Sequence, residues 1–195
     1  MATNAEPLSR PLFGGSFSAI IPPHSMDVSD IREIPDNQEV FIHSGTDQSI
    51  VIELLEHQVQ VPDQEAARYH FADMTSSNDA TGVEGTEIFS VEPVGGDQIA
   101  LQDPSSAWFL SGRQQVAKFN EQARNTVMIY LALFRLPQYS TDILITFNDP
   151  TEISPFSSST EAVGESSSSP TQPWSLEQFR ATVRSFRLLD PAIFP

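Results

Sequence analysis

The sequence contains no cysteine, and this absence excludes several kinds of site. Without thiols the chain can form no disulfide, no thiolate metal site and no cysteine nucleophile, and the composition fits a reducing compartment. The histidines show neither an i, i+4 pair nor an HExxH motif, so His43 and His57 could share a ligand only if the fold brought them together. We therefore expect neither a metal nor a cofactor.

Positive charge is also scarce. The 195 residues include 10 Lys and Arg against 26 Asp and Glu, which gives a net charge of −16. Such a chain lacks the cationic footprint of a nucleic-acid-binding protein, so we expect no nucleic-acid partner. Between Asp27 and Asp103 there are 17 acidic residues and only two basic ones, Arg32 and Arg68. A solvated acidic surface is the common reason for such asymmetry, and a docking face for a basic partner is the alternative.

Long apolar runs and catalytic motifs are missing as well. No apolar run approaches about 18 residues and no basic-then-apolar leader is present, so neither membrane insertion nor secretion is expected. The sequence has no P-loop, GxGxxG or GxSxG motif, and no carboxylate pair stands in a context that marks an acid and a base. An enzyme is therefore unsupported, and we expect a binding protein.

What the sequence does contain is a pair of strands that are apolar on both faces. "TVMIYLALFRLPQYSTDILITFN" consists of two apolar runs joined through Pro137-Gln138. A strand with two apolar faces must be covered on both, and a short connection makes the two strands antiparallel. The pattern predicts an α/β (α+β) fold: an α/β/α sandwich with a central antiparallel sheet and helices on both faces.

The other elements follow from local patterns. A helix is predicted over 62–74, with Ala66, Ala67, Tyr69, His70 and Met74 on its apolar side. A second begins at the capping-box pair Ser175 and Gln178 and buries Leu176, Phe179, Val183 and Phe186. A Gly14-Gly15 turn predicts a hairpin over 11–23, "DVSDIREIP" predicts one or two helical turns, and the final apolar tail suggests a last sheet edge. Further strands are predicted over 38–44, 49–57, 87–94 and 107–120.

The length suits one domain, which we place at 11–195. Residues 1–10 are short and polar and are predicted to be a disordered tail. The Ser- and Pro-rich stretch at about 154–173 has almost nothing to bury and is predicted to be a mobile insertion.

The unusual feature is acid placed among apolar residues. In "SIVIELLEHQ", strand alternation puts Ile50, Ile52 and Leu54 on one face and Glu53 on the other, with Glu56 at the strand end. The block "DVSDIREIPDNQEVF" supplies Asp27, Asp30, Asp36 and Glu39 together with Arg32. Solvated strand ends, a helix cap at Asp27 or Ser29 and a turn at Asp36-Asn37 are the plainer interpretations.

Six separated segments in order resemble one family. They are "PLFGGSFSAIIPP", "DVSDIREIPDNQEVF", "DQSIVIELLE", "ARYHFADM", "LFRLPQYSTDILITFN" and "PWSLEQF". Together they are similar to the Ran guanine nucleotide release factors, the Mog1 family of small Ran-binding nuclear-import proteins. The resemblance runs from about Pro11 to Phe194, the serine-rich insertion excepted.

The resemblance implies the sandwich fold shared with PsbP proteins, and a function. It implies binding to the GTPase Ran, release of its guanine nucleotide and support of nucleocytoplasmic transport, in the nucleus and cytoplasm. For vertebrate-type members it implies a second role in carrying a voltage-gated sodium channel to the cell surface. A trafficking adaptor for a membrane protein, without nucleotide release, is the alternative, and we expect a monomer.

The resemblance also selects site residues. The family's [DE]-Leu-Leu-Glu motif falls on Glu53 and Glu56, which are expected to contact Ran. The neighbouring block makes Asp27, Asp30, Arg32, Asp36 and Glu39 expected contacts at the rim.

Overall fold

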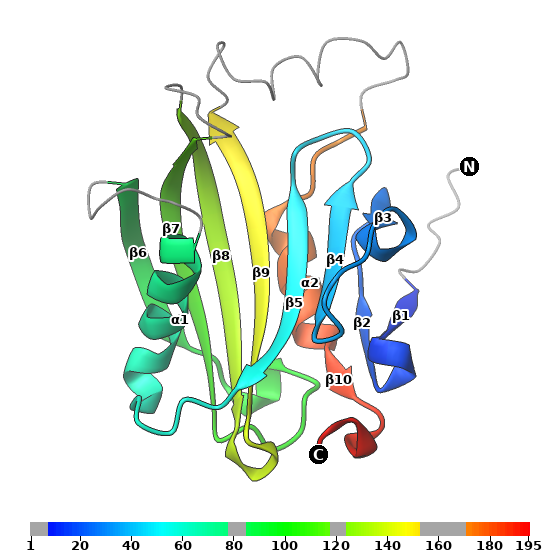
Figure 1. Cartoon of the computed structure of the whole chain (residues 1–195), viewed down its shortest axis with the longest axis vertical. Coiled ribbons are helices and arrows are strands. Elements are labelled where there is room, and N and C mark those ends of the chain that lie inside the picture. Colours follow the sequence, from blue (N-terminus) through cyan, green and yellow to red (C-terminus); the bar gives the residue numbers. More distant parts are fainter. Residues whose placement is uncertain (1–7, 78–84, 118–123, 153–170) are drawn as a thin grey trace.

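A computed structural model describes residues 8–77, 85–117, 124–152 and 171–195 of the chain (Figure 1). Its centre is a seven-stranded, wholly antiparallel sheet in the order β3-β4-β5-β9-β8-β7-β6. The strands are β3 (Ser25–Asp27), β4 (Gln38–His43), β5 (Ser49–Glu56), β6 (Thr86–Pro93), β7 (Ser106–Ala117), β8 (Arg124–Leu136) and β9 (Thr141–Glu152).

The two strands that are apolar on both faces, β8 and β9, lie inside this sheet as predicted. They form a hairpin through the 3₁₀ turn Pro137–Tyr139, and Leu133 pairs with Leu144. Their side chains alternate between two separate cores, with Leu133 and Leu144 in one and their neighbours Phe134 and Ile145 in the other. Both faces of these two strands are therefore covered, which confirms the prediction made from their apolar alternation.

Each face is covered by one helix, so the predicted sandwich is confirmed. The helix α1 (Asp63–Ser77) packs on β6, β7 and β8 through Ala66, Ala67 and Phe71. The helix α2 (Leu176–Ser185) covers the opposite face (Figure 1). Neither helix within the described ranges is long and apolar enough to cross a membrane.

The prediction for the buried side of α1 is wrong at one position. Tyr69 remains 41% exposed, whereas Phe71, which the helical pattern did not include, is buried. Tyr69 lies one position before His70, and the helix turns its ring toward the solvent while His70 and Phe71 enter the sheet side. The four expected core positions of α2 hold: Phe179, Val183 and the following Phe186 are buried, and Leu176 is half-buried.

A second, three-stranded sheet lies beside α2 and was not predicted. It consists of β1 (Ser9–Leu12), β2 (Phe17–Ile20) and β10 (Arg187–Leu188), in the order β1-β2-β10. The first two strands are the predicted hairpin, and β10 comes from the C-terminal apolar tail. Gly14 (φ 67°) and Gly15 (φ 94°) supply left-handed backbone in the turn, but the turn spans four residues, 13–16, and not the two residues that the glycine pair predicted.

The described residues overlap both the predicted N-terminal tail and the predicted insertion. The strand β1 begins at Ser9, within the stretch 1–10, and residues 1–7 lie outside the described residues. Most of the insertion, 153–170, also lies outside them. Its last three residues, 171–173, lie against the domain, where the Gln172 carbonyl is 3.1 Å from His43 Nε2.

Gln48 also holds the chain that follows the insertion. Gln48, in the turn between β4 and β5, accepts a hydrogen bond from Trp174 N (2.7 Å) and donates one to Trp174 O (2.9 Å). The indole of Trp174 donates in turn to Pro23 O (2.6 Å). Two residues later α2 starts with the predicted capping box between Ser175 and Gln178.

Candidate partner-binding site

Glu53 lies on β5, on the face of the sheet that carries α1. Its carboxylate accepts a hydrogen bond from Nε2 of Gln38 (2.7 Å), the residue of β4 that is paired directly with Glu53. The side chain is half-buried, and this burial raises the pKa of Glu53; the Gln38 bond and the charge of His70 offset part of the rise. No arginine in the described part of the chain neutralises it. Glu53 is therefore a carboxylate held in place by an amide.

Glu56 is the last residue of β5 and is exposed. It makes no ion pair with any residue that the structure describes. Because three positions separate it from Glu53, strand alternation directs the two side chains to opposite faces of the sheet. The pair thus brackets the end of β5 and does not form one flat patch.

Glu39 and Asp27 lie together on the face opposite Glu53. Glu39 accepts a hydrogen bond from the backbone N–H of Phe13 and so joins β4 to the N-terminal hairpin. Burial raises the pKa of Glu39, the charge of Asp27 raises it further, and the Phe13 bond and Arg10 lower it. Asp27 caps the 3₁₀ turn Val28–Asp30 by accepting from Ser29 N (2.9 Å) and Ser29 Oγ (2.6 Å). Both acids have structural tasks, and the capping interpretation of Asp27 is confirmed.

Asp30, Arg32 and Asp36 are exposed on the connection between β3 and β4. The end of this connection reaches β5, because Leu54 N donates to Asn37 O (2.9 Å) and Asn37 Nδ2 donates to Leu54 O (3.1 Å). Asp36 therefore precedes a residue that is bonded to β5 between Glu53 and Glu56. Asp30 and Arg32 lie nearer the other end of the connection, beside the capped turn.

Beneath the end of β5 lies a buried cluster of charged side chains that the sequence did not predict. The carboxylate of Asp142, fully buried on β9, contacts four donors: His57 Nδ1 (2.7 Å), His70 Nε2 (2.9 Å), Arg135 Nε (3.2 Å) and Gln58 N (3.3 Å). Burial acts to raise the pKa of Asp142, but the bonds from His70, His57, Gln58 and Arg135 outweigh it and lower the pKa from 3.8 to about 2. The carboxylate is therefore ionised throughout the neutral range.

A signal for this cluster was present in the sequence. Arg135 and Asp142 interrupt the two most apolar runs of the chain, and they face each other across the β8–β9 hairpin. Opposite charges at such positions predict a buried ion pair, since charged residues are buried only when they are paired. The two histidines carried no comparable signal, because their meeting depends on α1 and on the connection that follows β5.

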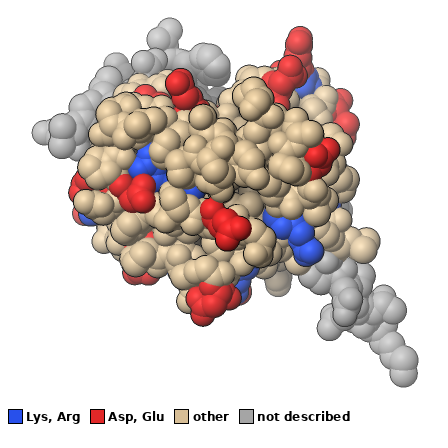
Figure 2. All heavy atoms as spheres, turned by 90° about the horizontal axis from the view of Figure 1, so that it is seen from below, with Lys and Arg blue, Asp and Glu red and all other residues tan. Residues whose placement is uncertain are grey.

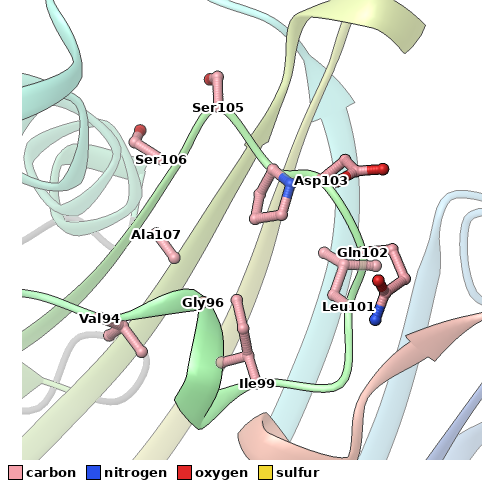
Figure 3. A pocket seen from close by; sticks show the side chains of 10 residues that line it. Val94, Gly96, Ile99, Leu101, Gln102, Asp103, Ser105, Ser106 and Ala107 are labelled. Carbon is pink, nitrogen blue, oxygen red and sulfur yellow. The ribbon is translucent and has the colours of Figure 1, made fainter.

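A cavity of about 380 Å³ lies under the connection between β6 and β7, and Figure 3 shows the side chains that line it. Asp103 is the only titratable residue of that lining. A lone carboxylate does not provide the paired acid and base that proton-transfer catalysis uses.

The structure thus brings Glu53, Glu56 and Asp36 to the end of β5, whereas Asp27 pairs with Phe41, which pairs with Ile50 near the start of β5. Seen from the end where β5 finishes, acidic side chains are spread over the surface with fewer basic ones between them (Figure 2). The family described as the Ran-interacting Mog1 protein matches residues 10–150. The chain belongs to this Mog1 family.

Two vertebrate Mog1 relatives match nearly all of the chain, and a yeast relative matches a shorter part. A Ran guanine nucleotide release factor of Danio rerio is 55% identical over 187 residues, which are 96% of this chain and 100% of the relative. The human protein of that name is 47% identical over 185 residues, 94% of this chain and 95% of the relative. The nuclear import protein MOG1 of Saccharomyces cerevisiae is 31% identical over 150 residues, 71% and 64% of the two chains.

Solved Mog1 structures share the architecture. The crystal structure of the Saccharomyces cerevisiae Ran-binding protein Mog1p superimposes with a TM-score of 0.67 at 25% identity, covering 96% of this chain and 98% of that one. A Mog1 point mutant gives a TM-score of 0.68 at 24% identity, which supports the fold alone. The Mog1 sandwich of two helices around an antiparallel sheet is thus confirmed for this sequence.

Proposed function

We propose that the protein binds the small GTPase Ran with the acidic end of β5 and promotes release of the bound guanine nucleotide. The observation that carries the proposal is the state of Glu53 and Glu56 in a Mog1-family chain. One carboxylate is fixed by an amide and the other is free of ion pairs with described residues. Both can therefore accept a cation from a partner without breaking an internal ion pair.

The expected partner chemistry follows from how GTPases hold nucleotide. The phosphates are gripped by a P-loop lysine, backbone N–H groups and Mg²⁺. A protein that binds the nucleotide-poor form more tightly lowers the affinity for nucleotide by the same factor, because linkage is reciprocal. Carboxylates that engage the cations of the phosphate site favour that form. Release is then a consequence of differential binding, and no bond is made or broken.

The seven expected contact residues differ in the bonds that they already make within the protein. Glu53, Glu56 and the exposed Asp36 surround the end of β5 and form the centre of the proposed contact. Asp30 and Arg32 are exposed rim residues, and rim charges act mainly on the association rate. Asp27 and Glu39 are engaged in a cap and in a hairpin bond, so we propose that they support the rim.

Charge reversal at the two glutamates tests the proposal. Glu53→Lys/Glu56→Lys is expected to weaken Ran binding in calorimetric titration and to slow the release of a fluorescent guanine nucleotide from Ran. Glu92→Lys/Asp97→Lys is the matched control, because it changes the net charge equally at exposed positions beside β6, the opposite edge of the sheet. Equal loss in both variants would mean that only net charge matters, and unchanged affinity in the test variant would reject the site.

Ionic strength gives a second measure of the same contact. The screening length falls from about 10 Å at 0.1 M salt to about 3 Å at 1 M, so an exposed acidic rim attracts a basic partner much less at high salt. The association rate with Ran is expected to fall with added salt in the wild type and to respond less in the charge-reversed variant. A rate that does not depend on salt would argue against electrostatic steering.

The wider setting rests on the family. We propose that the protein supports nucleocytoplasmic transport in the nucleus and cytoplasm, as a monomer, and acts as a regulator without enzymatic activity of its own. Trafficking of a voltage-gated sodium channel stays a prediction from the resemblance, since no described surface selects a channel segment.

A further inference from the structure

The buried cluster around Asp142 contacts the residue that follows Glu56 and also contacts α1, which covers the face of the sheet that carries Glu53. On one side, His57 directly follows Glu56, and its Nδ1 lies 2.7 Å from Asp142 Oδ1. The backbone N–H of His57 also donates to Ser140 O (2.9 Å), in the turn that leads to Asp142. The end of β5 is therefore tied to the start of β9 by two bonds immediately after Glu56.

On the other side, the cluster reaches Glu53 through α1. His70 is buried, and its Nε2 lies 2.9 Å from Asp142 Oδ2. Among the influences on the pKa of Glu53, His70 lowers it and Asp73, three residues further along α1, raises it. One carboxylate thus holds two histidines: His57 directly follows Glu56, and His70 lies on the helix that covers the Glu53 face of the sheet.

Arg135 fixes the connection that joins these two histidines. Its Nη2 donates to Gln58 O (2.7 Å) and its Nη1 donates to Val61 O (2.7 Å) and to Asp63 Oδ1 (2.8 Å). The guanidinium is itself held by Asp142. The path from Glu56 to the first turn of α1 is therefore held at three points by one buried guanidinium.

We propose that Asp142 is a positioning residue of the Ran-binding site: it fixes Glu56 through His57, and through His70 it holds α1 over the face of the sheet that carries Glu53. The inference rests on the proposed function and deepens it, since Asp142 itself is buried and touches no partner. Fold stability alone does not require such a cluster, because apolar residues of similar volume commonly replace buried ion pairs without loss. A fully satisfied hydrogen-bonded network specifies one arrangement of its members, so this cluster suits the fixing of charges in one orientation.

Paired substitutions separate orientation from bulk. His57→Asn keeps an N–H donor near the place of Nδ1, and His70→Gln keeps one near the place of Nε2, whereas His57→Ala and His70→Ala remove them. Each alanine variant is expected to bind Ran about tenfold more weakly, within the range of measured coupling effects, and the amide variants are expected to stay within about twofold of the wild type.

A destabilised control excludes a purely structural effect. Val183→Ala removes buried volume on α2, on the opposite face, and should lower the melting temperature without changing the affinity of the folded protein for Ran. All titrations are made well below the melting temperatures. If the alanine variants bind Ran as Val183→Ala does, the positioning role is overturned and the Ran-binding function stands.

A measurement without Ran tests the connection itself. Carboxyl carbon NMR follows the titration of Glu53 in the wild type and in His70→Ala. The groups that face the cluster are His57, Arg135, Asp63, Glu53 and Asp73, from β5 and its connection, β8 and α1. The pKa of Glu53 is expected to rise in His70→Ala, and an unchanged value would overturn the link. Failure of the wild type to bind Ran would instead reject the proposed function, and the positioning role with it.

Discussion

Replacing the buried Asp142 with Asn changes one atom of the structure and removes the charge at the centre of the cluster. Asp142→Asn leaves a single carbonyl oxygen where two carboxylate oxygens accept four hydrogen bonds. The new amide group must point its own N–H atoms at one pair of donors, and the buried Arg135 loses its fully buried counter-ion. We expect a folded but clearly destabilised protein.

The size of the effect follows from burial and from the pKa of Asp142. Removing one partner of a buried ion pair costs about 3–5 kcal/mol, because the remaining charge is left uncompensated. The lowering of the pKa from 3.8 to about 2 accounts for about 2 kcal/mol of this, at about 1.36 kcal/mol per unit. A carboxyl whose pKa is lowered on folding contributes fully above pH 3.8 and loses its contribution as the pH falls through about 2.

Urea unfolding between pH 7 and pH 2 measures both quantities. The free energy of unfolding of the wild type is expected to exceed that of Asp142→Asn by about 3–5 kcal/mol at pH 7, and the difference should shrink by about 2 kcal/mol toward pH 2. Other carboxyls titrate in both proteins and cancel in the difference. Asp47→Asn, an exposed acid in the turn between β4 and β5, is the control and should change little.

Two results would refute this reasoning. A loss no greater than that of the control would mean that the four contacts contribute nothing to folding. A large loss that stays constant from pH 7 to pH 2 would mean that shape rather than charge holds the cluster.

Two further substitutions probe burial and close packing. Because burial raises the pKa of Glu53, its ionised form opposes folding above pH 4.5. Glu53→Gln should therefore raise the melting temperature at pH 7 and leave it unchanged at pH 3. No rise at pH 7 would contradict the burial of this carboxylate. Gly112→Ala would place a Cβ 2.6 Å from the backbone oxygen of Glu87 and 3.1 Å from the Phe71 ring. Urea unfolding should therefore show a loss of about 1–3 kcal/mol in the free energy of unfolding. Gly96→Ala, where a Cβ meets nothing, is the control and should change little, and equal effects of the two substitutions would show that the sheet relaxes.

Sequence patterns were reliable where one element decides the outcome. The two-faced strands, the capping box at Ser175 and the glycine turn at Gly14 are local features, and the structure has all three. The hairpin of the second sheet was predicted, but the sheet itself was missed, because its third strand, β10, is two residues long and pairs with β2 only in the folded chain.

The acidic site was only partly predictable from the sequence, because contacts between strands decide its geometry. The sequence placed Glu53 and Glu56 at a strand end, and Asp27 at a cap. It did not show that Glu39 faces away from Glu53, because this depends on the register of β4 against β5. Nor did it show that Gln38 holds Glu53, since that contact joins two strands across a turn.

The sequence by itself determined the sandwich. Along β8 and β9 both alternating sets of side chains are apolar, and this local pattern indicates that both faces of the sheet are covered. Only the tertiary structure decided the environment of Asp142. Its partners lie at 57, 58, 70 and 135, on three different elements and connections, and no spacing in the chain relates them. Side chains from separate elements meet only when strand register and helix placement are fixed, and these are set by the packing of the whole core.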